Sequence, residues 1–594
     1  MRFVERFTER PAGVMAALSA LAHGWAEDLP EWRATAKSVA EQALTLAKVP
    51  LSSGMVRSVR LSGLGGIWRD VLRGRLNTST LFRFHAANKS NDIGLVDLQP
   101  SGSNEASSWI EKTWSFREID ERMDGIASAV RALELRAGSP AVVCLKNRAE
   151  VILIQGALGR IGVSAVSASW RSSVAELAYM VRDSGASLML FDIEIASTVD
   201  GLMTDSSMKG LTAICVGGHA PGYSTFDAFA SEATRSIPAT VGDPQMMMYT
   251  SGTTGKPKGA VRTLGAGAFL SAISTIGATP MTVGEIHLAV CPLYHATAFG
   301  FIALSYVLGS KVIVLREFRP ELFLEAVSRY RITTTALVPT MLYRIVELGS
   351  EFVSKFDLSS LKAIFCGGAP LSHALAMRAM DLLGDKIFNF YGATETGIVT
   401  IATPAELRAH PGTIGRAIAG TRVRLVDEAG HDCVDGQVGE VYTKSSMIIE
   451  GYHRNPDATE AAMRDGYFSV GDLGRRDAEG YLYLEGRKTD MIISGGMNIY
   501  PAEIEAVLEM HEDVLEAAVV GIGDEEWGER VRAVVVARRG SKCTDATLVA
   551  HARALLAGPK VPRDVVFVDS LPRNPTGKVL KSALKAMSSE RAVR

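Results

Sequence analysis

The sequence predicts an α/β protein with a large N-terminal domain of helix-covered sheets, a β-rich subdomain and a small α+β C-terminal domain. Three observations support this fold class. Strand-like apolar runs alternate with helical patterns across 140–366, short strands with Gly and Asp turns occupy 412–485, and a new helix begins at 502. Strand, helix and strand at this spacing are typical of parallel sheets covered by helices on both faces.

Hydrophobic periodicity assigns each element an expected range. In the large domain we expect strands at 140–145, 188–191, 212–216, 286–290, 311–315, 335–338 and 363–366, and helices at 114–137, 149–160, 174–183, 321–330 and 340–350. In the last hundred residues we expect helices at 502–510 and 544–556 and strands at 514–520, 531–537 and 563–568. These ranges predict three parts: 1–100, a helical N-terminal extension; 101–486, the large domain; and 487–594, the small domain.

The N-terminal extension contains a basic stretch at 55–84, rich in Arg, Leu and Trp. Such a stretch can lie on an anionic membrane surface, or it can pack on the main body with its arginines in water. Three glycines, Gly63, Gly65 and Gly66, interrupt any single long amphipathic helix and favour packing. Peripheral membrane contact through 55–84 stays as the alternative.

Composition indicates a cytoplasmic enzyme. The 594 residues carry a formal net charge of −2, which gives no electrostatic reason to expect a nucleic-acid partner. Six scattered cysteines lack any C-x-x-C pair or metal-site spacing and are expected to be reduced thiols. No run of eighteen apolar residues predicts a membrane span, and the short apolar stretch at 12–21 follows mixed charges that suit a signal peptide poorly.

The segment 249–259 is the most specific motif in the chain. It combines three glycines, four hydroxyl side chains and two lysines, which together offer backbone N–H groups, hydroxyl donors and ammonium groups to a polyphosphate. It is not a Walker loop, because only two residues separate Gly252 from Gly255 and Pro257 follows Lys256. A flexible linker would not need this order of residues. The candidate phosphate-binding residues are Thr250, Ser251, Gly252, Thr253, Thr254, Gly255, Lys256 and Lys258.

The segment 249–259 resembles the signature phosphate loop of the adenylate-forming superfamily, which includes acyl- and aryl-CoA synthetases, peptide-synthetase adenylation domains and firefly luciferases. The similarity covers about residues 110–590. Further matching segments follow in the family's order: 367–371, 391–396, 471–473 with Arg487, 490–505, and 572–581. Fatty acyl-CoA synthetases are the members that the chain resembles most.

The resemblance implies a nucleotide site built from several turns. Taken alone, 367–371 would be an ordinary strand-to-helix turn, and Thr394 and Glu395 would cap a following helix. In the family, the first turn borders the adenine, an aromatic ring stacks on it, a threonine contacts phosphate, an aspartate accepts both ribose hydroxyls, and an arginine contacts the nucleotide. The corresponding residues here are Gly368, Ala369, Pro370, Tyr391, Gly392, Thr394, Asp472 and Arg487.

The resemblance also implies ATP, Mg²⁺ and coenzyme A as cofactors. Glu395 matches the Mg²⁺ ligand, a role that suits a carboxylate beside phosphate oxygens. Lys578 matches the adenylation lysine, whose charge offsets charge crowding as the acyl oxygen attacks phosphorus. Lys581 and Lys585 are expected to be solvated. The small domain would be mobile, with 490–505 lining the pantetheine tunnel, although Thr489 stands where the family usually has Asp or Lys as the hinge.

His295 ends a motif at 291–295 that resembles the aromatic-His segment near the acyl carbonyl. As an isolated histidine it would more simply be a core residue. Amino-acid-activating relatives usually have Asp at this position, so His295 argues against an ammonium-bearing substrate. The apolar, small residues at 296–304 suit either a hydrocarbon tunnel or helical packing. We therefore expect a medium- or long-chain fatty acid, with Lys578, Glu395, Thr250 and His295 as the catalytic group.

Two rival functions follow from the same residues. A fatty acyl-AMP ligase that loads a carrier protein would use the same adenylation site, but it usually carries an inserted segment that the sequence lacks. A catalytically silent scaffold docked through 55–84 would not need Lys578, Glu395 and the 249–259 loop to be intact. The sequence thus favours an acyl-CoA synthetase that releases AMP and pyrophosphate.

Overall fold

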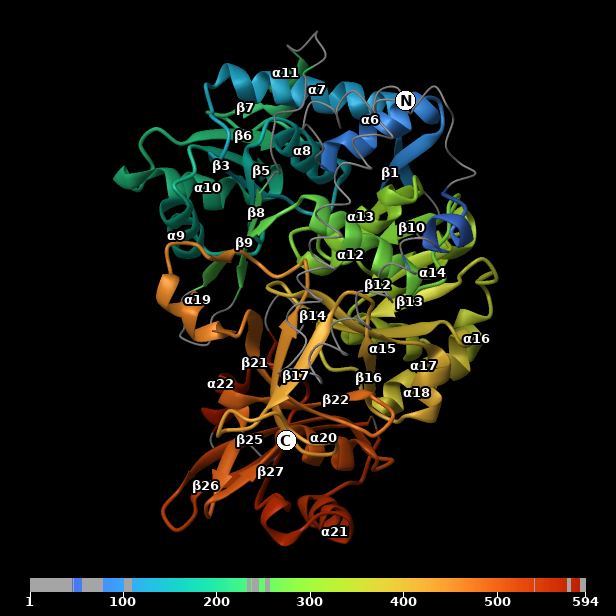
Figure 1. The fold of residues 1–594 in the computed structure, drawn as a ribbon, viewed down its shortest axis with the longest axis vertical. Coiled ribbons are helices and arrows are strands. Elements are labelled where there is room, and N and C mark those ends of the chain that lie inside the picture. Colours follow the sequence, from blue (N-terminus) through green and yellow to red (C-terminus); the bar gives the residue numbers. More distant parts are fainter. Residues whose placement is uncertain are drawn as a thin grey trace, which may run out of the picture.

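The computed structural model describes residues 45, 48–55, 78–100, 109–231, 237, 245–250, 257–538, 540–573 and 578–587. Within them the chain forms two large sheets and a smaller third one, and the C-terminal elements gather at one end of the molecule (Figure 1). The α/β fold class is confirmed.

The eight-stranded sheet is mostly parallel and has helices on both faces. In spatial order its strands are β19 (Gly451–Tyr452), β9 (Lys258–Thr263), β8 (Gln245–Thr250), β4 (Ser164–Ser167), β3 (Pro140–Cys144), β5 (Leu188–Asp192), β6 (Thr212–Val216) and β7 (Ser224–Thr225). Strand β3 shows why both faces are covered. Ala141 and Val143 join one apolar cluster, whereas Val142 and Cys144 join another, because successive side chains of a strand point to opposite faces.

Helices α7 (Phe116–Ala132), α8 (Ala149–Arg160) and α11 (Phe226–Ser231) contribute to the first cluster, and α9 (Val174–Ser184) and α10 (Ala196–Met203) contribute to the second. Two 3₁₀ turns flank α10, η1 (Ile193–Ile195) and η2 (Ser206–Met208). The first cluster also includes Val312 and Val314 of the other large sheet. Helices α7 and α8 therefore share one apolar layer between the two sheets.

The fourteen-stranded sheet joins a parallel centre to the β-rich subdomain. In spatial order its strands are β17 (Arg422–Val426), β18 (Gly439–Lys444), β21 (Tyr467–Arg476), β22 (Leu482–Arg487), β16 (Thr413–Ala417), β15 (Gly397–Ala402), β14 (Ile387–Ala393), β13 (Ala363–Cys366), β12 (Thr334–Leu337), β10 (Ile286–Ala289), β11 (Lys311–Leu315), β1 (Ile93–Pro100) and β2 (Trp109–Ser115), with β20 (Met463–Arg464) beside β21. Strands from β14 to β1 run parallel, and the strands from β15 to β17 pair antiparallel.

Helices α12 (Ala266–Gly277), α13 (Ala296–Val307), α14 (Pro320–Tyr330), α15 (Pro339–Val346), α16 (Gly349–Val353), α17 (His373–Leu383), α18 (Pro404–Ala409) and α19 (Pro456–Ala462) connect these strands. The third sheet has the order β24 (Met497–Ile499), β23 (Ile492–Ser494), β26 (Gly528–Ala537) and β25 (Val514–Asp524), with β27 (Asp564–Phe567) parallel to β26. Helices α20 (Pro501–Glu509), α21 (Asp545–Leu555) and α22 (Lys581–Lys585) and the 3₁₀ turn η4 (Gly558–Lys560) complete this C-terminal module.

Two predicted helices differ from the observed ones. The helix expected at 114–137 begins only at Phe116, because Ser115 caps it in a capping box with Glu118 and the preceding residues form β2. The helix expected at 340–350 is divided into α15 and α16, and Gly349, the first residue of α16, adopts a positive φ of 75°.

The N-terminal region enters the large domain earlier than predicted. Strand β1 pairs with β11 and with β2, so the boundary predicted at residue 100 falls inside a hairpin of the fourteen-stranded sheet. Helix α6 (Thr78–Asn88) packs on α7, and its Arg83 donates to the Asp124 carboxylate over 3.1 Å rather than pointing into water. Most of the basic stretch, 56–77, lies outside the described residues. Within the described part, no helix has the length and apolarity to cross a bilayer.

Arg160 supplies a buried ionic link between α7 and α8. Its side chain is fully buried and donates to Asp124 over 2.6 Å and to the backbone oxygen of Asp120 over 3.1 Å, and it also pairs with the Asp120 carboxylate. Removing one partner of such a pair leaves a buried charge without compensation.

We expect Arg160→Met to lower the free energy of unfolding of the large domain by about 3–5 kcal/mol, measured by urea denaturation. The control is Arg378→Met, which removes a pair of partly exposed side chains with Glu347 and should cost far less. Equal losses in the two variants would contradict the assignment of Arg160 as a structural link.

Candidate active site

The two ends of the predicted phosphate loop are held by a β-hairpin. Strands β8 and β9 run antiparallel, and their last paired residues are Thr250 and Lys258. The predicted residues Ser251, Gly252, Thr253, Thr254, Gly255 and Lys256 lie outside the described part of the chain. The Lys258 ammonium lies over the ring of Tyr452, 5.0 Å from its centroid.

Glu395 lies in the turn between β14 and β15, next to the end of β8. Its carboxylate is buried and accepts hydrogen bonds from the Thr250 hydroxyl (3.1 Å) and the Tyr452 hydroxyl (3.2 Å) at the same oxygen. The chain continues into a strand, so the alternative in which Thr394 and Glu395 cap a following helix is wrong. The backbone reverses here through Gly397, whose φ is 71°.

A half-buried arginine supports this turn from β9. Arg262 donates to the backbone oxygen of Thr394 over 2.5 Å. Burial lowers the pKa of Arg262 to about 10, and the Glu395 charge opposes the shift. Sequence reasoning missed Arg262 and Tyr452. An arginine directly after the apolar pair Ala260 and Val261, close to the phosphate loop, was the available signal for Arg262, whereas nothing in the sequence marks Tyr452.

Glycines allow the turns around Glu395 to approach one another. A Cβ on Gly392 would lie 2.1 Å from the backbone oxygen of Gly397, and one on Gly367 would lie 2.6 Å from the backbone oxygen of Phe390. Gly368 has a φ of 79° at the turn after β13. These close contacts bring the two segments to one cavity, which Gly368, Ala369, Pro370, Tyr391, Gly392, Thr394 and Glu395 line together.

Asp472 connects the β-rich subdomain to the same cavity. It lies on β21 opposite Arg487 of β22, whose Nε donates to it over 3.0 Å. The Tyr391 hydroxyl donates to the other carboxylate oxygen over 2.8 Å. Burial, followed by the Asp472 charge, raises the pKa of Tyr391. Gly471 and Asp472 both lie within β21.

Lys578 of the C-terminal module reaches this group. Burial lowers its pKa, the Arg487 charge lowers it further, and Asp472 and Glu395 oppose the shift. The Lys578 charge also acts on His295, whose pKa falls to about 4 mainly because the imidazole is buried. The lysine, both carboxylates and the histidine line one cavity. The structure thus brings together Thr250, Lys258, His295, Glu395, Asp472, Arg487 and Lys578.

The link between the large domain and the C-terminal module is short. A 3₁₀ turn at Lys488–Asp490 (η3) separates β22 from β23, and Thr489 in it is exposed. Lys581, expected to be solvated, instead donates to Glu505 of α20 over 2.9 Å, whereas Lys585 is exposed as expected. The ion pair fixes α22 to α20, so Lys578 lies just before a helix that is anchored in the module.

The cavity is large enough for more than a nucleotide. Its volume is about 3110 Å³, whereas pockets for single drug-sized ligands are about 300–1,000 Å³. Beyond the polar group, apolar and small side chains of α12 and α13 line it, among them Ala272, Gly300 and Ala303. Phe301 lines it too and stacks on Phe365 with 4.5 Å between ring centroids. Residues 296–304 therefore take part in both the cavity wall and the core.

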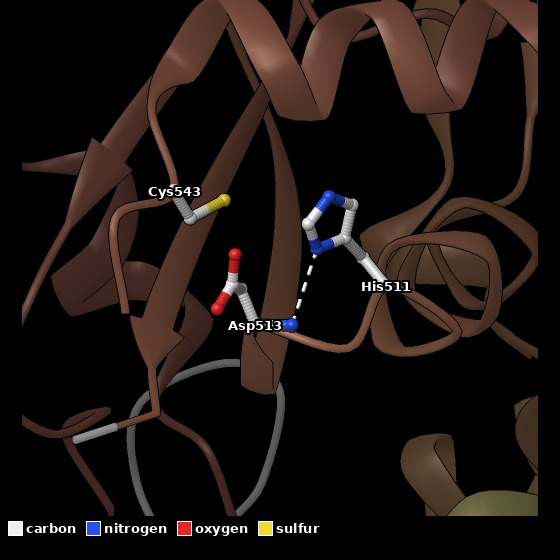
Figure 2. A group of neighbouring side chains, drawn as sticks. All are labelled: His511, Asp513 and Cys543. Atoms are coloured by element: carbon white, nitrogen blue, oxygen red, sulfur yellow. Dashed lines mark hydrogen bonds between the residues drawn. The ribbon is translucent and has the colours of Figure 1, made fainter. Parts of the chain in front are cut away.

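One group of potential metal ligands occurs elsewhere among the described residues. His511, Asp513 and Cys543 of the C-terminal module offer ligand atoms within 4.8 Å of one another (Figure 2). The Asp513 amide donates to Nδ1 of His511 over 3.2 Å, and Cys543 contacts the Thr547 hydroxyl at 3.5 Å. These protein contacts account for the arrangement. Cys543 nevertheless lies near two other potential metal ligands, which its spacing in the sequence does not reveal.

Comparison with known proteins matches two parts of the chain to known families. Residues 97–453 match the AMP-binding enzyme family, and 503–578 match the AMP-binding enzyme C-terminal domain. A feruloyl-CoA synthase of Amycolatopsis sp. is 35% identical over 473 residues, which is 79% of this chain and 93% of that protein. A long-chain-fatty-acid–CoA ligase of Mycobacterium tuberculosis is 29% identical over 476 residues, 80% of this chain and 93% of that one.

Among solved structures, the o-succinylbenzoate CoA synthetase of Bacillus subtilis in complex with its acyl-adenylate intermediate superposes with a TM-score of 0.73. It is 28% identical in sequence, and the match covers 86% of this chain and 98% of that chain.

Glu509 of α20 gives the contact between module and large domain a pH dependence. Burial raises the pKa of its carboxyl to about 7, the Glu505 charge acts in the same direction, and Ser372 of the large domain hydrogen-bonds it. If the module leaves, the pKa returns towards its ordinary value. The described orientation then binds the extra proton, so it loses stability as pH rises from about 4.5 to about 7.

We expect the population of this orientation to fall as pH rises from about 4.5 to about 7, measured by fluorescence transfer between dyes on the large domain and the module. Glu509→Gln should remove most of the change because the amide does not titrate. Glu512→Gln, at an exposed position of the same module, should leave it. A change of equal size in the Glu509→Gln protein would show that other groups control the orientation.

Proposed function

Because the chain belongs to the AMP-binding, adenylate-forming enzymes, we propose that it is an ATP-dependent acyl-CoA ligase. It would join a carboxylic acid to the α-phosphate of ATP, release pyrophosphate, and transfer the acyl group from AMP to coenzyme A. The observation that carries this proposal is the convergence of Glu395, Asp472 and Lys578, from three separate parts of the chain, on one cavity.

Asp472 would accept the ribose hydroxyls, held in place by Tyr391 and Arg487. The turn at Gly368, Ala369 and Pro370 would border the adenine, beside the Tyr391 ring. Thr394 and the residues from Thr250 to Lys258 would contact the phosphates. Neutral turns would thus lie beside the base, and hydroxyl and ammonium groups would lie beside the phosphates.

Glu395 and Thr250 fit a Mg²⁺ ion, since a buried carboxylate and a hydroxyl supply the oxygen donors that this ion prefers. When bound with ATP, Mg²⁺ would neutralise phosphate charge. Tyr452 and Arg262 keep the Glu395 turn in place from two sides. The protein's contribution is therefore positioning and charge neutralisation, the two main requirements of phosphoryl-centred substitution.

Lys578 would act on the reacting centre of the first half-reaction. Its ammonium offsets negative charge as the carboxylate oxygen bonds to the α-phosphorus and the bond to pyrophosphate breaks. His295, with a pKa of about 4, is neutral near pH 7 and can contact the acid's carboxyl group without adding charge. In the second half-reaction the coenzyme A thiol displaces AMP, and no covalent enzyme intermediate is needed.

The acid is proposed to have an apolar body, because small and apolar side chains of α12 and α13 line the cavity beyond His295. A medium- or long-chain fatty acid satisfies this condition, and so does an aryl acid such as ferulate. Similarity to the feruloyl-CoA synthase supports the aryl acid as a second candidate. Transfer to a carrier-protein thiol is the alternative second half-reaction, as in a fatty acyl-AMP ligase.

ATP–pyrophosphate exchange with acids of increasing length, from butanoate to hexadecanoate, together with ferulate and indoleacetate, tests the proposal. We expect exchange with at least one apolar acid and stoichiometric consumption of free coenzyme A with that acid. Exchange without coenzyme A consumption would favour the carrier-protein ligase. No exchange with any of the acids would contradict the proposed activity.

Lys578→Ala should separate the two half-reactions. Adenylate formation should fall about 10²–10³-fold, because a charge aimed at the transition state is lost, while a supplied acyl-adenylate should still react with coenzyme A. The control is Lys585→Ala. Lys585 is exposed on α22, the helix that follows Lys578, so its replacement should change neither rate. Equal loss of both half-reactions in Lys578→Ala would show that the lysine has a structural role instead.

A further inference from the structure

Residues 48–55 lie against the large domain ahead of the part that matches the AMP-binding enzyme family, which begins at residue 97. Val49 is 5% exposed and belongs to an apolar cluster with Ile273 and Ile276 of α12. The backbone oxygen of Ser53 accepts a hydrogen bond of 2.9 Å from the Val283 amide, just beyond this helix. The segment is thus attached by both apolar packing and main-chain bonding.

Glycines let the segment approach α12 closely. A Cβ on Gly277 would lie 2.8 Å from a methyl group of Val49 and 3.0 Å from that of Thr45. Gly54 has a φ of 82°, and a Cβ there would lie 2.8 Å from a methyl group of Val283. Contacts under 3.0 Å do not occur between real side chains, so both positions require glycine for this packing.

Helix α12 has a second face, which forms part of the active-site cavity. Ala268, Ser271, Ala272 and Thr275 line the cavity, and their spacing of three and four residues places them in one stripe. Ile273, Ile276 and Gly277 form a different stripe, which meets residues 48–55. Helix α12 therefore separates the cavity from residues 48–55, with one of its faces toward each.

A second cavity adjoins the contact between residues 48–55 and the end of α12. This cavity, of about 560 Å³, lies between Thr45, Lys48, Val49, Ser52 and Ser53 on one side and residues 276–277 and 279–282 on the other. Among the described residues, this end of α12 thus has packing partners on part of its surface only, and the contacts with residues 48–55 are the ones that hold it there. Val49 is the buried apolar side chain of the segment that enters the packing here.

We propose that residues 48–55 act as a brace that sets the position of α12 and thereby the size of acid that the cavity accepts. This inference rests on the proposed acyl-CoA ligase function. The side chains of the cavity stripe are small. The space available to the acid is therefore determined mainly by the backbone position of α12. Val49 and Gly277 are positioning residues in this view, because they act on the acid only through the helix.

The test compares acid preference in three variants, as the ratio of kcat/KM for hexadecanoate to that for octanoate, or for the bulkiest and smallest aryl acids accepted. Val49→Ala should change this ratio by about fivefold or more, because one methylene in an apolar pocket already discriminates at this level. The KM for ATP should stay the same. Gly277→Ala, which displaces the brace from the other side of the contact, should also change the ratio. Leu51→Ala, in the same segment but 67% exposed, is the matched control and should not change it.

The outcomes separate the inference from the function beneath it. A wild-type enzyme that is active, with unchanged acid preference in both Val49→Ala and Gly277→Ala, would overturn the brace and leave the ligase function standing. An equal loss of kcat/KM for all acids would also overturn it, since that indicates a role in folding alone. A wild-type protein inactive with every acid would overturn the proposed function and the inference with it. Should Val49→Ala fail to fold, Gly277→Ala decides by itself.

Discussion

The hydrogen bond between Thr250 and Glu395 is the contact on which the proposed active site depends. Thr250 ends a strand of the eight-stranded sheet, and Glu395 lies in a hairpin turn of the fourteen-stranded sheet. The two sheets share the apolar layer around α7 and α8, which holds them at a fixed separation. Thr250 and the carboxylate therefore meet where the end of β8 reaches the turn after β14. The glycines at 367 and 392 allow the close approaches within the fourteen-stranded sheet that shape this turn.

Charge balance imposes a second constraint on the residues around Glu395. Glu395 is buried, and the half-buried Arg262 lies directly behind its turn, so neither charge stands alone in a low-dielectric region. Asp472 and Arg487 form a similar pair on the other side of the cavity. Tyr391 and Tyr452 each donate one hydrogen bond to these carboxylates, which fixes the carboxylate orientation without changing the net charge. Such a site is organised before any substrate enters.

Local patterns predicted the elements well, and long-range contacts were harder to foresee. Strands 212–216, 311–315 and 363–366 have the expected bounds because their apolar runs end at turn residues. The hairpin β14–β15 was missed, since Thr and Glu after a turn also suit a helix N-terminus, and only pairing with distant strands decides between them. Six residues of the phosphate loop lie outside the described part of the chain, so their predicted roles stay predictions.

The convergence of Lys578 with the large-domain carboxylates was expected from the resemblance alone. Nothing local in 572–581 indicates a partner some hundred residues earlier in the chain. Arg262 and Tyr452 carry no motif that sequence reasoning recognised, yet they contact the Glu395 turn directly. The brace at residues 48–55 likewise depends on two glycines whose importance appears only when the opposing methyl groups are in place.

In the proposed reaction, the position of Lys578 also gives a physical reason to expect the module to move between half-reactions. Burial and Arg487 both disfavour the lysine's charge, and Asp472, Glu395 and Asp490 oppose them. In the proposed reaction, bound ATP adds negative charge beside Lys578 and so strengthens the described orientation. Departure of pyrophosphate removes most of that charge, and mainly the three carboxylates are then left to offset the desolvation of the ammonium and the nearby Arg487 guanidinium. The orientation that serves adenylation is thus weakened by its own product, which favours release of the module before the thiol arrives.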